Sequence, residues 1–419
     1  MRRRNTPALG RALGLAAIVC LVATLVVLGA LPRGLAQSKT LYVGITLPLT
    51  GADAEDAELI KDGALLAIEQ QNAKGGVAGY KIEPIILDNG TATAGQYDPA
   101  QAATNIRKLV ANVGVVANIG PQMSGSGKAM SPILSEADLA TITPSSTNPD
   151  ITDPKFASQY RPNGKAVYFR TVTTDAYQGP NMANFMAEKL RVKSVYVLDD
   201  SGAYGVGMAD AFQKRAGVKG MKVLGRDQLN PKEADYTTVL TKIKGLNPDA
   251  IYYGGVAQAG VKLAKQAYDV VPKLIKAGGD GVQGASFLKA GFPAVDGWYS
   301  TIAGPHVTED PKAQAIVQAF KKRWGKNPDD YSITAYDAAL VIMDAIKRVA
   351  ASGKPVDRHS VRDAIQPTHL MTVQGLISFD ENGDIKNRVV SVFQYRHNKE
   401  FPDDDILHQI KYIGIAPQD

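Results

Sequence analysis

The residues best suited to chemistry lie in a Gly/Ser-rich segment, Gly120–Lys128, which follows an apolar run and precedes a helix expected over Gly127–Glu136. Its spacing does not match a phosphate-binding loop, because the first glycine of that motif would fall on Gln122 and Ala129 stands where a hydroxyl residue is required. A Gly/Ser loop that opens a helix still points free N–H groups and hydroxyls at one spot. This arrangement suits an anion such as a carboxylate; an ordinary helix N-cap is the alternative.

A second hydroxyl-rich segment, Thr143–Pro149, follows another apolar run. In open α/β proteins, ligands bind at the carboxyl edge of a parallel sheet. We therefore expect the two segments to lie side by side at that edge and to form one polar site. Ordinary turn chemistry is the alternative for the second segment.

Motifs for catalysis, metals and cofactors are incomplete in this sequence. Asp380–Asp384 resembles the start of a calcium loop, but Ile385 occupies the position of the required glycine. We expect a hairpin turn there, between the strands Leu376–Phe379 and Val389–Tyr395. The five histidines lack metal-ligand spacing, and the chain has no Gly-x-Ser-x-Gly elbow and only one cysteine, Cys20. We expect no enzyme activity, no metal and no cofactor.

The first 36 residues have the pattern of an export signal. Arg2–Arg4 precede a mostly apolar stretch, Ala12–Leu31, and Gly34-Leu35-Ala36 forms a small-x-small cleavage site. An uncleaved membrane anchor is the alternative, because the apolar stretch is long enough to span a bilayer. Five of the six net positive charges lie in this segment, so residues 37–419 carry 42 basic and 41 acidic side chains. That balance argues against nucleic-acid binding.

Strand-like apolar runs alternate with segments of helical periodicity along most of the chain. The run Leu41–Leu47, for example, is followed by the helical pattern Ala57–Asn72. Such alternation predicts parallel sheets covered by helices. Because the pattern restarts near residue 169, we expect an α/β protein with two doubly wound parallel-sheet lobes joined by a multi-strand hinge. The lobes expected are residues 37–172 with 304–387 and residues 173–303 with 388–419.

Several short motifs follow one another in a distinctive order: Gly44-Ile45-Thr46-Leu47-Pro48-Leu49-Thr50-Gly51, Asn72-Ala73-Lys74-Gly75-Gly76, Ile142-Thr143-Pro144, Gln178-Gly179-Pro180, Tyr204-Gly205-x-Gly207 and Tyr252-Tyr253-Gly254-Gly255. Their order and spacing resemble the periplasmic leucine/isoleucine/valine-binding proteins, which are type I solute-binding proteins of ABC transporters. The resemblance covers essentially all of residues 37–419.

The resemblance implies a set of ligand-binding positions, namely Ser124, Gly125, Ser145, Thr147, Tyr204, Val256, Asp280 and Asp56. Ser124 corresponds to the serine that holds the ligand's carboxylate, and Tyr204 to a tyrosine of the second lobe that closes on the ligand. Asp280 corresponds to the acidic residue that binds the ligand's ammonium group. A carboxylate is suited to that role because it makes a charge-assisted hydrogen bond with an ammonium group.

Two of these positions depart from the family pattern. Asp56 replaces an aromatic residue in the first loop, and Val256 replaces an aromatic residue after the double glycine. The pocket thereby loses two aromatic walls and gains acid near its mouth, which weakens the case for leucine-like specificity. A solvated helix start is the alternative for the acidic run, which consists of Asp53, Glu55, Asp56 and Glu58.

These features together predict an extracytoplasmic solute-binding component of an ABC uptake transporter, located in the periplasm. Its ligand would be an amino acid or a related small polar metabolite, and its partner would be a permease in the inner membrane. We expect a monomer that does not bind nucleic acid. An amide, a polyamine or an aromatic acid is the alternative ligand, and a ligand-sensing module is the alternative role.

The export signal leads to a first prediction. Signal peptidase should cleave after Ala36, so the exported protein should begin near Gln37. Mass spectrometry of the protein from the periplasmic fraction measures this start directly. An intact chain beginning at Met1 in the membrane fraction would show that the apolar stretch is retained as an anchor.

Overall fold

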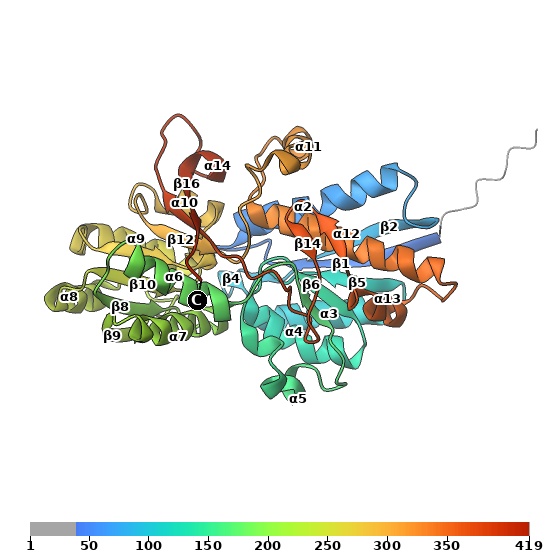
Figure 1. Cartoon of the computed structure of the whole chain (residues 1–419), viewed down its shortest axis with the longest axis horizontal. Helices are drawn as coiled ribbons and strands as arrows, with labels where there is room; N and C mark the ends of the chain where they lie inside the picture. Colours follow the sequence, from blue (N-terminus) through green and yellow to red (C-terminus); the bar gives the residue numbers. More distant parts are fainter. Residues whose placement is uncertain (1–38, 419) are drawn as a thin grey trace, which may run out of the picture. The chain divides into compact units, whose positions relative to one another are not determined.

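Two β-sheets carry the structure, a computed structural model that describes residues 39–418 (Figure 1). The first sheet has the strand order β2-β1-β5-β6-β7, and its β1–β5, β5–β6 and β6–β7 pairs are parallel. Its strands are β1 (Lys39–Leu47), β2 (Tyr80–Asp88), β5 (Val115–Ile119), β6 (Ala140–Thr143) and β7 (Tyr168–Arg170). Residues from Thr40 onward cluster as one unit. The predicted export signal lies outside the described residues.

The second sheet has the order β16-β15-β12-β11-β10-β8-β9. Strands β9 to β12 run parallel to one another and to β8, whereas β15 pairs antiparallel with both β12 and β16. The strands are β8 (Ser194–Asp199), β9 (Lys222–Gln228), β10 (Ala250–Gly254), β11 (Ile275–Gly278), β12 (Tyr299–Ile302), β15 (Ser391–Tyr395) and β16 (Ile410–Ile415). Two small antiparallel pairs complete the strands: β3 (Gly90–Thr91) with β4 (Gln96–Tyr97), and β13 (Leu370–Thr372) with β14 (Gly375–Ile377).

Helices cover both faces of the sheets, which is why the central strands are continuous apolar runs. Every residue of β5 and of β10 is buried. In Figure 1, α2 and α12 lie on one side of the first sheet, and α3 and α4 lie on the other. The helices are α2 (Ala54–Ala73), α3 (Pro99–Ala111), α4 (Ser124–Glu136), α5 (Ala157–Tyr160), α6 (Asp175–Glu188), α7 (Ala203–Val218), α8 (Thr237–Leu246), α9 (Ala257–Val270), α10 (Ala285–Gly291), α11 (Gln314–Trp324), α12 (Asp330–Ala351), α13 (Arg358–Ile365) and α14 (Ile406–Gln409). Within residues 39–418, no helix combines the length and apolarity that crossing a membrane requires.

The chain passes between the two sheets more than once. It leaves the first sheet after β7 and returns after β12 to form α12, which packs against α2. It passes back to the second sheet before β15. The chain crosses between the sheets near residues 172, 303 and 387, where the lobe boundaries were predicted. The division into lobes itself remains a prediction.

The prediction of a hairpin around Asp380–Asp384 is wrong in one respect, because the strands on the two sides of the turn do not pair with each other. The turn itself forms and is closed by an isolated bridge between Phe379 and Ile385, but β14 pairs with β13, and β15 pairs with β12 and β16. Arg170 of β7 explains the difference: its Nε donates to Asp384 Oδ1 over 2.7 Å, and its backbone N–H donates to the carbonyl of Gly383. The turn is therefore held on the first sheet, while the strand after it joins the second.

The contact between α2 and α12 places the start of α12, which contributes to the site described below. Gly63 of α2 lies against the first turn of α12, where a Cβ on Gly63 would stand 2.0 Å from the carbonyl oxygen of Ser332. No side chain fits at that separation, so the two helices approach this closely only because residue 63 is glycine.

We predict that Gly63→Ala lowers the free energy of unfolding by about 1–3 kcal/mol, because the added methyl forces the helices apart. Gly217→Ala in α7 is the matched control, since a Cβ there would meet nothing within 4 Å. That substitution should leave stability unchanged or raise it, because alanine is the better helix former. Urea denaturation of both variants measures the difference; equal stability would show that α2 and α12 can separate without cost.

Candidate ligand-binding site

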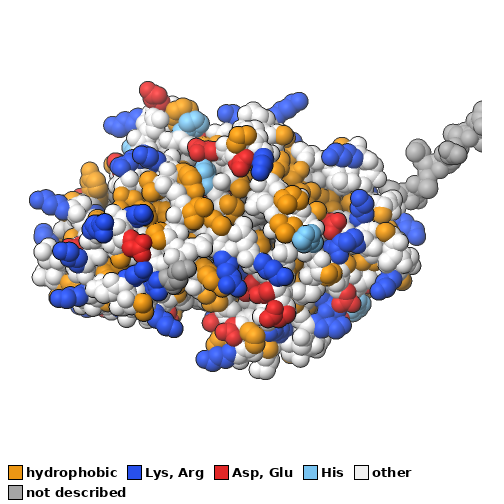
Figure 2. All heavy atoms as spheres, viewed as in Figure 1, with side chains coloured by type: hydrophobic (Ala, Val, Ile, Leu, Met, Phe, Trp, Pro, Cys, Tyr) orange, Lys and Arg blue, Asp and Glu red, His pale blue; other side chains and the backbone are white. Residues whose placement is uncertain are grey.

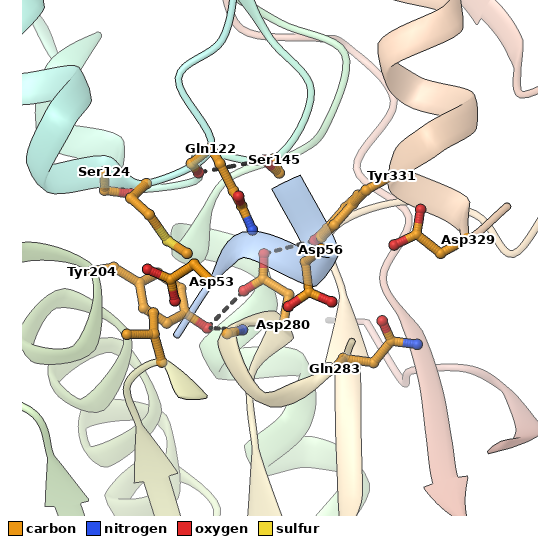
Figure 3. A pocket seen from close by; sticks show the side chains of 13 residues that line it. Asp53, Asp56, Gln122, Ser124, Ser145, Tyr204, Asp280, Gln283, Asp329 and Tyr331 are labelled. Atoms are coloured by element: carbon orange, nitrogen blue, oxygen red, sulfur yellow. Dashed lines mark hydrogen bonds between the residues drawn. The ribbon is translucent and has the colours of Figure 1, made fainter. Parts of the chain in front are cut away.

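A pocket of about 480 Å³ of unfilled space, part of it open solvent, lies where the carboxyl ends of strands from both sheets meet (Figure 3). Loops after β1, β5 and β6 line it from the first sheet, loops after β8, β10 and β11 line it from the second, and the start of α12 completes it. The lining residues are Asp53, Asp56, Gln122, Met123, Ser124, Ser145, Tyr204, Val256, Asp280, Gly281, Gln283, Asp329 and Tyr331. This is the sheet edge at which the hydroxyl-rich segments were expected to meet.

One wall of the pocket is the N-terminus of α4. The helix begins at Ser124, three residues earlier than expected, and no side chain caps it. Ser124 Oγ accepts hydrogen bonds from the backbone N–H of Asn148 over 3.1 Å and from the hydroxyl of Ser146 over 3.3 Å. The two hydroxyl-rich segments are thus joined through Ser124, whose own proton is left to donate. Free N–H groups at the positive end of a helix dipole and a donating hydroxyl favour a carboxylate here.

The opposite pole of the pocket is the carboxylate of Asp280, which follows β11. Its Oδ1 accepts from Tyr204 Oη over 2.6 Å and from Gln178 Nε2 over 2.7 Å, and its Oδ2 accepts from Tyr331 Oη over 2.6 Å. Burial raises the pKa of Asp280, and these hydrogen bonds oppose the rise. Asp175 lies nearby, and its pKa is raised well above the usual value by burial and by the charge of Asp280.

The acidic run at the start of α2 divides into two faces. Asp53 is buried, and its Oδ2 accepts a hydrogen bond from the backbone N–H of Tyr97 over 3.1 Å. Asp56 Oδ1 accepts a hydrogen bond from the backbone N–H of Ser286 over 3.2 Å. Both line the pocket. Glu55 and Glu58 instead make ion pairs with lysines away from it. A solvated helix start is therefore the wrong interpretation for Asp53 and Asp56, which lie three residues apart on the inward face of the helix.

The carboxylates in the pocket raise one another's proton affinity. Burial, with repulsion from Asp329 and Asp53, raises the pKa of Asp56 from 3.8 to about 7. Burial also raises the pKa of Asp53 and that of Asp329 to about 6. No Lys, Arg or His is among the described residues that line the pocket. Within the described part of the chain, no group of His, Cys, Asp and Glu is arranged to hold a metal ion.

The structure brings most of the predicted site residues together. The lining includes Asp56, Ser124, Ser145, Tyr204, Val256 and Asp280. Gly125 and Thr147 do not line the pocket. Gly125 instead packs on Tyr97, whose ring would lie 2.9 Å from a Cβ at residue 125. Thr147 is fully buried, and its carbonyl accepts from the N–H of Asp175 over 3.0 Å.

Sequence reasoning missed several lining residues. Gln122 and Met123 belong to the segment that was singled out, but no motif marked them. Asp329 and Tyr331 lie far beyond Asp280 in the sequence, at the start of α12. A signal was present, because Asp329 followed by Ser332 has the pattern of a helix N-cap with its partner, and the structure forms this capping box.

Comparison with known proteins identifies the family. The sequence profile described as periplasmic binding protein matches residues 40–400. The chain belongs to this family. A leucine-, isoleucine-, valine-, threonine- and alanine-binding protein of Pseudomonas aeruginosa is 31% identical over 362 residues, covering 85% of this chain and 90% of that protein. A Leu/Ile/Val-binding protein of Rhizobium johnstonii is 29% identical over 360 residues, covering 85% and 92%.

Solved structures of periplasmic binding proteins agree with the fold. A leucine-binding protein from Thermotoga maritima matches with a TM-score of 0.77 at 26% identity, over 90% of this chain and 98% of that one. A solute-binding protein from Rhodopseudomonas palustris in complex with 3,4-dihydroxybenzoic acid matches with a TM-score of 0.72 at 20% identity, over 91% and 98%; this likeness shows the fold alone. The predicted family and the predicted α/β fold with doubly wound parallel sheets are confirmed.

The raised pKa of Asp56 leads to a prediction about stability in the absence of ligand. The folded protein holds the proton between pH 3.8 and about 7, whereas the unfolded chain has released it. Stability contributed by protonated Asp56 is therefore present at low pH and lost as the pH rises through this window. Asp56→Asn cannot ionise, so it should gain on the order of 1 kcal/mol over the wild type at pH 8 and nothing near pH 4.

Denaturation of both proteins at pH 4.5 and pH 8 measures that gain. Glu55→Gln is the control, because it removes a carboxylate of the same helix that is paired with Lys289 over 2.7 Å and lies outside the pocket. The stability of Glu55→Gln relative to the wild type should not increase as the pH rises. A gain of equal size at both pH values in Asp56→Asn would contradict the assignment of Asp56 as a half-buried carboxyl that its neighbours repel.

Proposed function

We propose that this periplasmic binding protein is the extracytoplasmic solute-binding component of an ABC uptake transporter and binds an amino acid or a closely related metabolite. One observation carries the proposal: the same pocket holds an uncapped helix N-terminus with Ser124 on one side and the hydrogen-bonded carboxylate of Asp280 on the other. These two poles complement the carboxylate and the ammonium group of an α-amino acid. The relatives named for binding leucine, isoleucine and valine support it.

The pocket is built to bind the ammonium group with a fixed carboxylate. Tyr204 comes from α7 beside the second sheet and Tyr331 from α12, which packs on α2. Both hydroxyls donate to Asp280, so the carboxylate is oriented where the two sides meet. A ligand that contacts Ser124 and Asp280 together would bridge loops of the two sheets. Such a ligand would bind more tightly when the loops meet than when they are apart. It would therefore favour closure of the two lobes, whose existence was predicted from the sequence.

The transport role carries further expectations. We propose that the protein is exported, is cleaved near Gln37, acts as a monomer in the periplasm and delivers its ligand to an inner-membrane permease without transforming it. The net charge, nearly zero over residues 37–419, gives no support for nucleic-acid binding. Figure 2 agrees on the face in view, where Lys and Arg side chains are interspersed with acidic and apolar ones.

An aromatic acid without nitrogen is the weaker candidate ligand. The Rhodopseudomonas palustris protein in complex with 3,4-dihydroxybenzoic acid shows that the fold accommodates such a ligand. In this chain, however, the ligand would lie beside Asp280, Asp56 and Asp53, which line the pocket. A purely anionic ligand would add repulsion there and leave these carboxylates without a counter-charge.

We predict that Asp280→Asn weakens amino-acid binding by about 2–5 kcal/mol, because the ammonium group would be buried without its counter-charge. Ser124→Ala should cost less, about 1.5–3 kcal/mol, because the backbone N–H groups of α4 still hold the carboxylate. Calorimetry measures both, using whichever of leucine, threonine and lysine raises the melting temperature most.

Asp269→Asn is the control for the loss of a carboxylate, because Asp269 is exposed on α9 and away from the pocket. It should bind the same amino acid at wild-type strength. Full-strength binding by Asp280→Asn would mean that the ligand is not held as an amine, and the amino-acid assignment would then have to be dropped.

A further inference from the structure

The pocket contains more negative charge than one ammonium group can balance. Asp53, Asp56, Asp280 and Asp329 all line it, and no basic side chain is among the described lining residues. Asp280 is the best satisfied of the four, with three donors on its two oxygens. An α-ammonium group beside Asp280 would leave the others to be balanced by something else.

Asp56 has an oxygen available for a ligand. Its Oδ1 accepts from Ser286 N–H and lies so close to Gly284 that a Cβ there would stand 2.4 Å away. Among the described residues, its Oδ2 has no hydrogen-bond partner. Figure 3 shows the Asp56 carboxylate in the pocket between Asp280 and Asp329.

Gln122 provides an independent indication that the ligand carries a hydrogen-bond donor. Its side chain is nine-tenths buried, and its Oε1 has no hydrogen-bond partner in the described part of the chain. Figure 3 shows that this side chain extends from the loop after β5 into the pocket, with its amide nitrogen directed at Asp280. A buried carbonyl oxygen without a donor costs free energy, so a ligand N–H at this point would satisfy it.

A metal ion and an apolar side chain both fit these observations less well. The carboxylates are spread along the pocket, and within the described residues they form no group that could hold a metal ion. Met123 and Val256 are the aliphatic side chains in the lining. A leucine side chain would desolvate Asp56 and Asp329 without pairing them, which is unfavourable.

We propose, on the basis of the function proposed above, that the ligand is a basic amino acid, with its α-ammonium group at Asp280 and a second cationic group held by Asp56 and Asp329. Ser124 and the N-terminus of α4 hold its carboxylate. The replacement of an aromatic residue by Asp56 is then the change that selects a charged side chain in place of an apolar one.

Calorimetry with leucine, lysine and the diamine cadaverine tests the proposal on the wild type, Asp56→Asn and Glu55→Gln. The wild type should bind lysine at least about tenfold more tightly than leucine. Asp56→Asn should weaken lysine binding about 10- to 100-fold, which corresponds to one charge-assisted hydrogen bond, and should leave leucine binding unchanged or stronger. Glu55→Gln should behave as the wild type, because Glu55 pairs with Lys289 outside the pocket.

Asp329→Asn provides a second variant in case Asp56→Asn does not fold. Asparagine caps a helix as well as aspartate does, so α12 should keep its start while the pocket loses a charge. It too should weaken lysine binding more than leucine binding. Thermal unfolding of each ligand-free variant confirms that it is folded before titration.

The outcomes separate this inference from the proposed function. Tighter binding of leucine than of lysine, or an unchanged lysine affinity in both pocket variants, would overturn the basic-amino-acid assignment and leave amino-acid binding in place. Tighter binding of cadaverine than of lysine would overturn it in favour of a diamine, because the carboxylate pole would then contribute nothing. Failure of the wild type to bind any of a full set of amino acids would instead defeat the proposed function.

Discussion

The carboxylate of Asp280 and its three donors are the interaction on which the site depends. The donors come from the neighbouring helices α6 and α7 and from α12, which lies far beyond them in the sequence. A buried carboxylate without such donors would take up a proton and lose the charge that a cation recognises. The chain must therefore bring these helices together with the end of β11 before the pocket has a negative pole. The close packing of α2 on α12 at Gly63 serves the same end, because it places the helix that carries Tyr331.

Much of this arrangement could be predicted from local patterns. Alternating strands and helices predicted parallel sheets, and the carboxyl-edge rule then placed the segments around Ser124 and Ser145 at one site. Asp280 and Tyr204 came from the resemblance to leucine/isoleucine/valine-binding proteins, since nothing in their own surroundings marks them. Gly125 and Thr147 were expected at the site for the same reason; neither is among the residues that line the pocket, and their roles remain a prediction.

The remaining features depend on contacts that no local pattern contains. Tyr331 and Asp329 reach the pocket because the chain returns from the second sheet to pack α12 on α2. The turn at Asp380–Asp384 was recognised, but the pairing of the strands beside it was not, because Arg170 binds that turn from a distant strand. Burial also could not be deduced for the acidic run. Helix periodicity separates Asp53 and Asp56 from Glu55 and Glu58, yet only the neighbours of each face show which pair is inside.

The charges in the pocket connect recognition with the arrangement of the two sheets. Asp56 belongs to a helix of the first sheet and accepts from Ser286 in a helix beside the second, so this hydrogen bond forms only where the two sides meet. The same approach brings Asp280 of the second side into one pocket with Asp56 and Asp329 of the first. A ligand shifts the balance between two arrangements only by binding one arrangement more strongly than the other. A ligand with two cationic groups would do so, because only the arrangement in which the sides meet offers one molecule Asp280 together with Asp56 and Asp329. The division of these carboxylates between the two sides would thus be the source of such a ligand's preference for the closed arrangement.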